Sequence, residues 1–390
     1  MFSSRFPSEL APNALFRAVE RARRSGTPLL DLTETNPTAV GLPYPSGVFD
    51  GLADDRALVY RPDPLGAVEA REAVAGAYRQ QGIDMDARRI ALAASTSEAY
   101  SVLFKLFCNP GDAVLVPQPS YPLFELLAGF DAVHAVPYRL RLSEDWAIDR
   151  DSLLAALTPA ARAILVVTPN NPTGSMLRLD DRDWLVGVAD RHRLPLISDE
   201  VFAEYAVAPR HDVSRLAGER RALTIALGGL SKSAGLPQAK LAWMAVSGPD
   251  VLVRQALEHL EIVLDTYLSV ATPVQVATPL LLAAGEDIRR LIADRLRQNL
   301  EVLRRAAGRA QALTLLEPEG GWSAVLRVPA AQTEERLAID LVTTAGVIAH
   351  PGYFFDFAEE AFLVVSLLPR PDVFEDAVAR IVRHLTGSSS

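Results

Sequence analysis

One lysine draws attention for the chemistry it could perform: Lys232, inside the segment 228–237, which reads GGLSKSAGLP. An apolar run at 221–227 precedes this segment and another follows at 241–246, so the pattern predicts a turn between two buried strands. Lysine is rarely buried, and burial favours its free amine, the form that makes a Schiff base with an aldehyde. From this segment alone, an exposed turn lysine is an equally good interpretation.

Polar side chains also follow three other apolar runs, each at a predicted strand end. They are Ser95, Thr96 and Ser97 after the run 90–94, Asn171 after 163–167, and Asp199 after 194–198. Ser95 to Ser97 open a predicted helix, where hydroxyls and free amides either cap the helix or bind an anion. Because ligands of parallel sheets bind beyond the carboxyl ends of the strands, we expect these groups to meet Lys232.

The elements that position these residues follow from the alternation of apolar runs and helical patterns between residues 67 and 246. This alternation predicts an α/β fold with a mostly parallel sheet flanked by helices. The run at 163–167 is apolar throughout, as in a strand buried on both faces. Beyond it, long helices are predicted at 250–267 and 286–309. Short strands at 322–328 and 362–367, with helices at 333–345 and 371–385, then indicate a smaller α+β domain.

The composition excludes several classes of protein. The chain has 390 residues, 49% of them hydrophobic, which suffices for two domains and a sizeable core. Its formal net charge of -9 argues against nucleic acid or an anionic membrane as the main partner. Cys108 is the only cysteine, which precludes an internal disulfide and a thiolate metal cluster, and no metal site is predicted. With no secretory signal and no apolar run of about 18 residues, we expect a cytoplasmic protein.

The residue types at the strand ends match the parts of one cofactor. A lysine amine forms an imine with an aldehyde, and an aspartate keeps a pyridine nitrogen protonated so that the ring withdraws electrons. An asparagine can donate to a ring oxygen, and hydroxyls and amides at a helix start can bind phosphate. Together they indicate a pyridoxal phosphate site. Individually they have ordinary explanations too, with Asp199 as a strand-end cap and Asn171 as a turn residue.

Over about residues 31–385 the sequence resembles the aspartate-aminotransferase-like family, fold type I of the pyridoxal phosphate enzymes. The resemblance is carried by the motifs Asn171-Pro172-Thr173-Gly174, Ser198-Asp199-Glu200-Val201, and Ser231-Lys232 followed by Gly235-Leu236-Pro237. Each motif is modest alone, but their order and gaps are highly specific.

The resemblance implies an architecture as well as an activity. A large cofactor-binding domain at 46–280 is expected to hold a mostly parallel, seven-stranded sheet flanked by helices. A smaller α+β domain is expected from residues 1–45 together with 281–390. The family also forms homodimers with shared active sites, so we expect this chain to do the same.

The resemblance further implies a role for individual residues. Lys232, Asp199 and Tyr121 form the implied catalytic group: Lys232 makes the Schiff base and moves the substrate Cα proton, Asp199 pairs with the pyridine nitrogen, and Tyr121 stacks on the ring. Asn171 bonds the phenolic oxygen of the cofactor. The implied phosphate contacts are Ser95, Thr96, Ser97, Ser231 and Lys240 from one subunit and Tyr60 from its neighbour. Asn36 and Gly41 are expected on the substrate side.

Three positions depart from the family pattern. Phe202 stands where the family has a tyrosine that bonds the phenolic oxygen, so we expect the linkage on Lys232 to stay protonated to higher pH. Lys240 replaces a phosphate-binding arginine and keeps its charge without the forked geometry. The segment 362–367 lacks the arginine that clamps the substrate carboxylate. Arg327 is predicted as its replacement and Arg370 as a weaker candidate, although a solvated strand-end arginine also explains Arg327.

The sequence therefore predicts a pyridoxal-phosphate-dependent aminotransferase of class I/II, which moves an amino group from an amino donor to a 2-oxo acid. The missing arginine keeps open a lyase, such as a carbon–sulfur β-lyase, or a decarboxylase on the same fold. A non-enzymatic effector domain of a transcription regulator is a further alternative, which the joint presence of Lys232, Asp199 and Asn171 disfavours. The amino donor and acceptor are not identified by the sequence.

Overall fold

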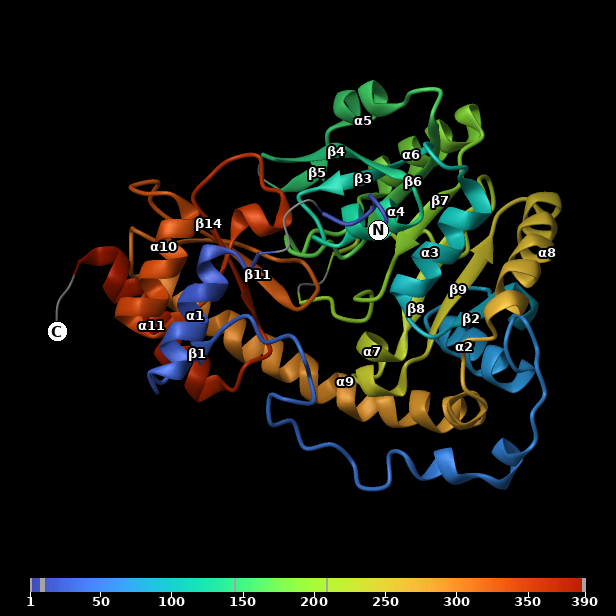
Figure 1. Ribbon diagram of the computed structural model, residues 1–390, viewed down its shortest axis with the longest axis horizontal. Coiled ribbons are helices and arrows are strands. Elements are labelled where there is room, and N and C mark those ends of the chain that lie inside the picture. The colour runs from blue at the N-terminus through green and yellow to red at the C-terminus, as the bar shows by residue number, and fades with distance from the viewer. Residues whose placement is uncertain (1, 8–10, 144, 208–209, 388–390) are drawn as a thin grey trace.

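The computed structural model describes residues 2–7, 11–143, 145–207 and 210–387, and its largest element is an eight-stranded sheet (Figure 1). In spatial order the strands are β2 (Ile90–Ala93), β9 (Ala242–Ser247), β8 (Thr224–Gly229), β7 (Leu196–Asp199), β6 (Ala161–Val167), β3 (Ala113–Gln118), β4 (His134–Leu142) and β5 (Trp146–Ile148). The five strands from β8 to β4 are parallel, whereas β9 is antiparallel to both of its neighbours. The predicted α/β fold with a mostly parallel sheet is confirmed.

The sheet has one strand more than the seven predicted. The additional strand is β5, which pairs antiparallel with the end of β4 at the edge of the sheet. It is only three residues long and mostly half-buried, so it lacks the long apolar run that identifies the central strands. Such a short edge strand forms because it pairs with β4 in a hairpin, and its own sequence contains no apolar run that would predict it.

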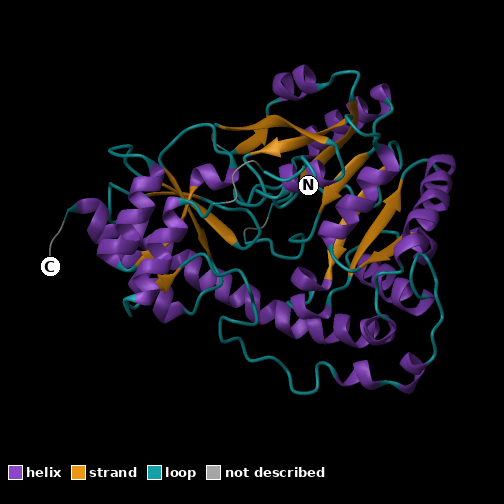
Figure 2. Cartoon of the chain, in the orientation of Figure 1, coloured by secondary structure: helices purple, strands orange, loops and turns teal. Residues whose placement is uncertain are grey.

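Helices cover both faces of the sheet (Figures 1 and 2). On one face lie α3 (Thr96–Phe107), α4 (Phe124–Phe130) and α8 (Asp250–Tyr267); on the other lie α2 (Val68–Gln80), α5 (Arg150–Ala156), α6 (Leu179–His192) and part of α9 (Thr272–Ala307). Consecutive residues of β3 point to opposite faces of the sheet: Val114 packs toward α3 and Leu115 packs toward α6. The central strands are therefore apolar on both faces, as the run at 163–167 predicts.

Two smaller sheets are built from the two ends of the chain. Strand β1 (Leu30–Asp31) pairs parallel with β12 (Val347–Ile348), and β10 (Thr314–Leu316), β11 (Ser323–Arg327), β14 (Phe362–Ser366) and β13 (His350–Pro351) form an antiparallel sheet. The accompanying helices are α1 (Ala14–Arg24), α10 (Glu334–Asp340) and α11 (Pro371–Thr386). Every strand of the large sheet falls inside residues 46–280 and every strand of the smaller sheets outside. The division into two domains at these boundaries stays a prediction.

Helix α9 begins fourteen residues earlier than the predicted start at Glu286. Pro279 lies inside the helix, and an internal proline normally argues for a break. Here the early part of the helix packs against α2 and the late part against α11, so tertiary contacts outweigh the local signal. No helix in the described ranges combines the length and apolar character that crossing a bilayer requires.

Candidate active site

Lys232 lies just beyond the carboxyl end of β8, in the short helix α7 (Leu230–Ser233) rather than in the predicted simple turn. Its Nζ lies 4.6 Å from the centre of the Trp322 ring and 5.5 Å from that of Phe202. Burial against these rings lowers the pKa of the Lys232 amine to about 8, while the charge of Asp199 acts in the opposite direction. A lysine in this setting carries an appreciable fraction of free amine near neutral pH, which is the nucleophilic form.

Three side chains from distant parts of the chain hold the backbone that carries Lys232. Tyr205 Oη donates to the Lys232 carbonyl (2.6 Å) and Arg289 Nη1 to the Ser233 carbonyl (2.6 Å). Tyr44 Oη donates to the Gly235 carbonyl (2.5 Å). These donors come from the loop after β7, from α9 and from the N-terminal segment. Three separate segments of the chain therefore hold the backbone around Lys232 in place.

Asp199 ends β7, and its carboxylate is buried with 8% of the residue exposed. Its Oδ2 accepts a hydrogen bond from Tyr100 Oη (2.6 Å), and its Oδ1 accepts one from the backbone N–H of Val201 (3.1 Å). Burial raises the pKa of the Asp199 carboxyl, and these two hydrogen bonds act to lower it. Tyr121 is close enough that the Asp199 charge adds to the effect of burial in raising the Tyr121 pKa.

The start of α3 provides the predicted anion-binding groups. Ser95 is the N-cap, and its hydroxyl accepts from the N–H of Glu98 (3.1 Å), as the capping pattern predicts. The hydroxyls of Thr96 and Ser97 bond to no other described residue. Lys240 is exposed and lines a recess of ≈ 430 Å³ together with Ala94, which directly precedes the N-cap. The start of α3 thus has two hydroxyls without a described partner, and Lys240 shares a recess with the residue before the N-cap.

Asn171 connects the large sheet to the small antiparallel sheet. It follows β6, and its Oδ1 accepts a hydrogen bond from Ser323 Oγ at the start of β11 (3.4 Å). Ser323 is directly opposite Ser366 of β14. Within the described residues, β14 carries no arginine, so hydroxyl groups occupy the strand pair nearest to Asn171.

Within the described residues, the other residues predicted for the substrate or for the neighbouring subunit's phosphate make no hydrogen bond or ion pair with Lys232 or Asp199. Arg327 is at the other end of β11 from Ser323, exposed, with its guanidinium 5.5 Å from the Phe362 ring centre. Arg370 is exposed and paired with Asp372. Asn36 and Gly41 lie on an exposed loop that passes Arg370, and Tyr60 is 72% exposed. Their predicted roles therefore stay predictions, without a direct contact to Lys232 or Asp199.

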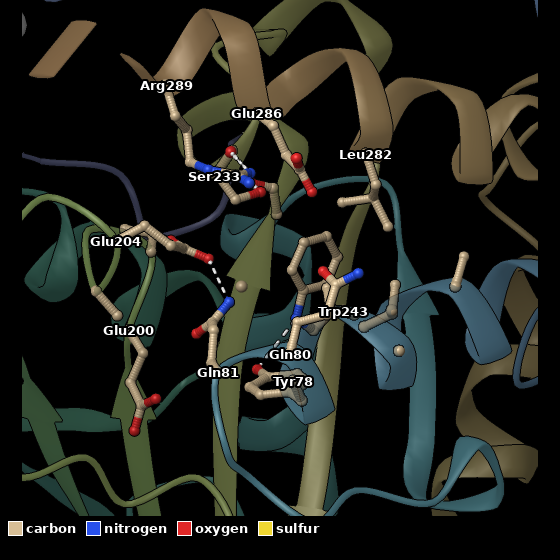
Figure 3. Close-up of a pocket in the computed structure, with 18 of the residues that line it drawn as sticks. Tyr78, Gln80, Gln81, Glu200, Glu204, Ser233, Trp243, Leu282, Glu286 and Arg289 are labelled. Atoms are coloured by element: carbon tan, nitrogen blue, oxygen red, sulfur yellow. Dashed lines mark hydrogen bonds between the residues drawn. The ribbon is translucent and has the colours of Figure 1, made fainter.

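A cavity of ≈ 680 Å³ lies on the far side of the lysine-bearing turn, between α2 and α9 (Figure 3). Its lining includes Gln80, Gln81, Glu200, Glu204, Ser233, Trp243, Leu282, Glu286 and Arg289. Figure 3 shows Arg289 reaching from α9 to the backbone of Ser233, and Glu204 meeting Gln81. None of the residues predicted for the cofactor site lines this cavity, so it is not that site.

Several residues of the site have no local signal in the sequence. Tyr100 contacts Asp199 across 99 residues, Tyr205 contacts the Lys232 backbone across 27, and Arg289 contacts Ser233 across 56. Trp322 is 2% exposed, and only the preceding Gly320-Gly321 pair marks its position in the sequence. A tyrosine one turn inside a capped helix is the one feature that could have directed attention to Tyr100.

The fold, with Asp199 and Lys232 at the ends of neighbouring strands, is typical of one class of enzyme, and comparison with known families agrees. Residues 45–381 match the family described as aminotransferase class I and II. The chain therefore belongs to this family of fold type I, whose members depend on pyridoxal phosphate, and it is an aminotransferase.

Individual aminotransferases are similar to this chain over nearly its whole length. The chain is 26% identical over 383 residues to the glutamate-pyruvate aminotransferase AlaA of Escherichia coli K12, covering 96% of this chain and 94% of that protein. It is 24% identical to the alanine aminotransferase of Mycobacterium tuberculosis H37Rv, covering 94% and 87%. Among solved structures, the alanine aminotransferase of Pyrococcus furiosus superposes with a TM-score of 0.90 at 22% identity and full coverage of both chains. That last likeness shows the fold.

Proposed function

We propose that this chain binds pyridoxal phosphate at Lys232 and transfers the amino group of a small neutral amino acid, with alanine as the first candidate, to a 2-oxo acid. The observation that carries this proposal is the Lys232 amine, whose pKa burial lowers to about 8, close to the buried Asp199 carboxylate. The amine can form an imine with the cofactor's aldehyde, and the carboxylate can pair with its pyridine nitrogen.

The residues present fit the cofactor on their own chemistry. Thr96 and Ser97 have hydroxyls at a helix start that bond to no other described residue, and Lys240 supplies a positive charge in a recess that it shares with Ala94. Asp199 offers a buried carboxylate for the pyridine nitrogen. The amide nitrogen of Asn171 donates to no described residue, so it is free to meet the phenolic oxygen. We propose Ser231 as a further contact of the cofactor's phosphate.

The chain's own residues perform three tasks in this proposal. Bound pyridoxal phosphate supplies an electron-withdrawing ring that stabilises negative charge at the substrate Cα. Asp199 holds the proton at the pyridine nitrogen, which keeps the ring withdrawing electrons. Lys232, as a free amine, accepts the proton from Cα and returns it. Tyr121 packs against the face of the ring and fixes its orientation.

The substrate class is proposed from the lining of the site and from the relatives. Phe202 and Trp322 place apolar rings around the Lys232 amine, which suits the small apolar side chain of alanine as donor. The Escherichia coli and Mycobacterium tuberculosis relatives are named for alanine or for glutamate and pyruvate. These names support alanine as the donor, with pyruvate as the 2-oxo acid that it forms. The contact to the substrate carboxylate is proposed to include Asn171 and Ser323. Arg327 stays the sequence-based candidate.

We also propose a homodimer, because the exposed Tyr60 is free to reach the phosphate site of a neighbouring subunit. Tyr60 and Ser269 line one small recess, and Ser269 Oγ donates to Glu98 at the start of α3 (2.8 Å). The Tyr60 loop therefore lies on the same side of the molecule as the proposed phosphate site. A cytoplasmic location stays a prediction from the sequence.

One observation favours a second candidate function, a lyase on the same fold. Within the described residues β14 has no arginine to hold a substrate carboxylate in the family's manner. The test incubates the purified, cofactor-loaded protein with L-alanine and 2-oxoglutarate, with Lys232→Ala as control. Matched formation of pyruvate and glutamate that requires the acceptor supports the aminotransferase. Repeated release of pyruvate and ammonia from cysteine or cystathionine without an acceptor would support the lyase instead.

A further inference from the structure

Tyr100 is a buried tyrosine whose hydroxyl has one hydrogen-bond partner among the described residues, the Asp199 carboxylate. It lies in the second turn of α3 with 2% of the residue exposed, and its Oη donates to Asp199 Oδ2 over 2.6 Å. Burial and the neighbouring Asp199 charge raise the Tyr100 pKa well above its ordinary value, so the phenol stays protonated and remains a donor. The contact is therefore a charge-assisted hydrogen bond in a dry environment.

The tyrosine ring is held in a fixed position. Phe104 stacks beside it at 6.2 Å between ring centres, and Phe124 meets it edge-on at 5.4 Å. Tyr121 contacts Phe124 in turn, at 5.8 Å. This packing leaves the Tyr100 hydroxyl directed at Asp199 and restricts the positions that the carboxylate can adopt.

Helix α3 therefore joins two parts of the proposed site. Thr96, in its first turn, belongs to the proposed phosphate contacts, and Tyr100 lies one turn later on the same side of the helix. One rigid helix thus carries both a residue proposed to bind the phosphate and the tyrosine that contacts Asp199. A single helix can in this way set the distance between both ends of the cofactor.

We propose that Tyr100 is a positioning residue that keeps Asp199 ionised and aligned for the pyridine nitrogen; this inference rests on the proposed function. Burial alone makes the Asp199 carboxyl harder to ionise, and the Tyr100 hydrogen bond opposes this. Without the hydroxyl the carboxylate is a stronger base, so the shared proton moves toward Asp199 and away from the cofactor nitrogen. The ring then withdraws electrons less effectively, and the cofactor binds less tightly at low pH.

The groups around Asp199 allow the titration to be interpreted. Those that face it are Tyr100 from α3, Lys232 from α7, Glu200 from the same strand end, and the more distant Tyr121. Tyr100 and Tyr121 have pKa values raised above their ordinary range, so both stay neutral below about pH 8. A change confined to the acid side of the profile therefore reports on the carboxylate.

The test compares Tyr100→Phe, which keeps the ring and removes only the hydroxyl, with the unaltered protein. Cofactor-free protein is titrated with pyridoxal phosphate between about pH 5 and pH 8, and binding is followed by tryptophan fluorescence. We expect about tenfold weaker binding near the acid end and a rise of about one unit in the pH of half-maximal affinity. The pH midpoint of the bound cofactor's visible absorption should also move.

Tyr138→Phe is the matched control, because Tyr138 is an equally buried tyrosine whose hydroxyl donates to the Leu165 carbonyl (2.8 Å) away from the site. It should lower stability without moving either midpoint. In an Asp199→Asn background, Tyr100→Phe should have little further effect if it acts through the carboxylate charge. Tyr100→Leu is a second variant that also lacks the hydroxyl, should Tyr100→Phe fail to fold.

The outcomes separate this inference from the proposed function. If the unaltered protein binds the cofactor and Tyr100→Phe has the same affinity and midpoints, Tyr100 is a packing residue and the inference is wrong. Equal effects of Tyr100→Phe and Tyr138→Phe would contradict it as well. If the unaltered protein itself fails to bind pyridoxal phosphate, the proposed function fails first, whatever the variants do.

Discussion

Replacing Lys232 by methionine should stabilise the cofactor-free protein at neutral pH, because the fold confines an ammonium group between the rings of Phe202 and Trp322. Burial lowers the Lys232 pKa from its ordinary value of 10.5 to about 8. Each pH unit corresponds to about 1.4 kcal/mol, so the charged amine costs the folded state about 3 kcal/mol at most. Methionine keeps a similar volume and removes the charge.

The sign of the pH dependence follows from this shift. Below about pH 8 the amine is charged in both the folded and unfolded states, and the full cost is present. Between about pH 8 and 10.5 the folded state loses the proton while the unfolded chain keeps it, so the cost disappears as the pH rises. The stability gap between variant and unaltered protein should therefore shrink by about 1 kcal/mol from pH 7 to pH 9, and further toward pH 10.5.

Urea unfolding of cofactor-free protein, at one protein concentration and several pH values, measures this gap. Lys240→Met is the matched control, since it makes the same substitution at an exposed lysine. Packing differences at Lys232 add a constant offset and leave the pH dependence intact. A Lys232→Met gap that is flat or that widens between pH 7 and pH 9 would refute the account of a buried amine.

Three other predictions concern the site. Phe202→Tyr restores a hydroxyl beside Lys232, and we expect the pH midpoint of the bound cofactor's visible absorption to fall; an unchanged midpoint would show that the hydroxyl does not reach the cofactor. Arg327→Ala should change KM for alanine by less than about twofold, because Arg327 lies over Phe362 at the far end of β11; a tenfold rise would restore it as the carboxylate ligand. Mixing Lys232→Ala subunits with Tyr60→Ala subunits should recover activity that neither variant has alone, measured by pyruvate formation, because a hybrid dimer contains one intact site; no recovery would contradict shared sites.

The chemistry at the strand ends could be predicted because each residue follows a strand of the parallel sheet directly. Asp199 and Lys232 stand at the carboxyl ends of the neighbouring strands β7 and β8, and the rule that such ends meet at one edge brings them together. The N-cap at Ser95 could be predicted equally well, since capping depends on residues only three positions apart. These parts of the site are local in sequence or follow from sheet topology.

The supporting residues could not be predicted, because their partners are far away along the chain. Nothing near Tyr100 marks a contact with Asp199, and nothing near Arg289 marks a contact with Ser233. Such pairs are decided by how α3 and α9 pack on the sheet, which no local pattern encodes. The predicted start of α9 at Glu286 is wrong for a related reason. Pro279 is a residue that usually interrupts a helix, and here the packing of α9 outweighs this local preference.

The most direct test of the central claim is a single-turnover experiment on the cofactor-loaded protein with L-alanine and no 2-oxo acid. We expect the visible absorption of the bound cofactor to be lost while one equivalent of pyruvate forms per site. Adding 2-oxoglutarate should then restore the absorption, and Lys232→Ala should show neither change. No spectral change with any amino acid, or loss of the absorption without formation of pyruvate, would contradict the assignment of Lys232 as the residue that carries amino transfer.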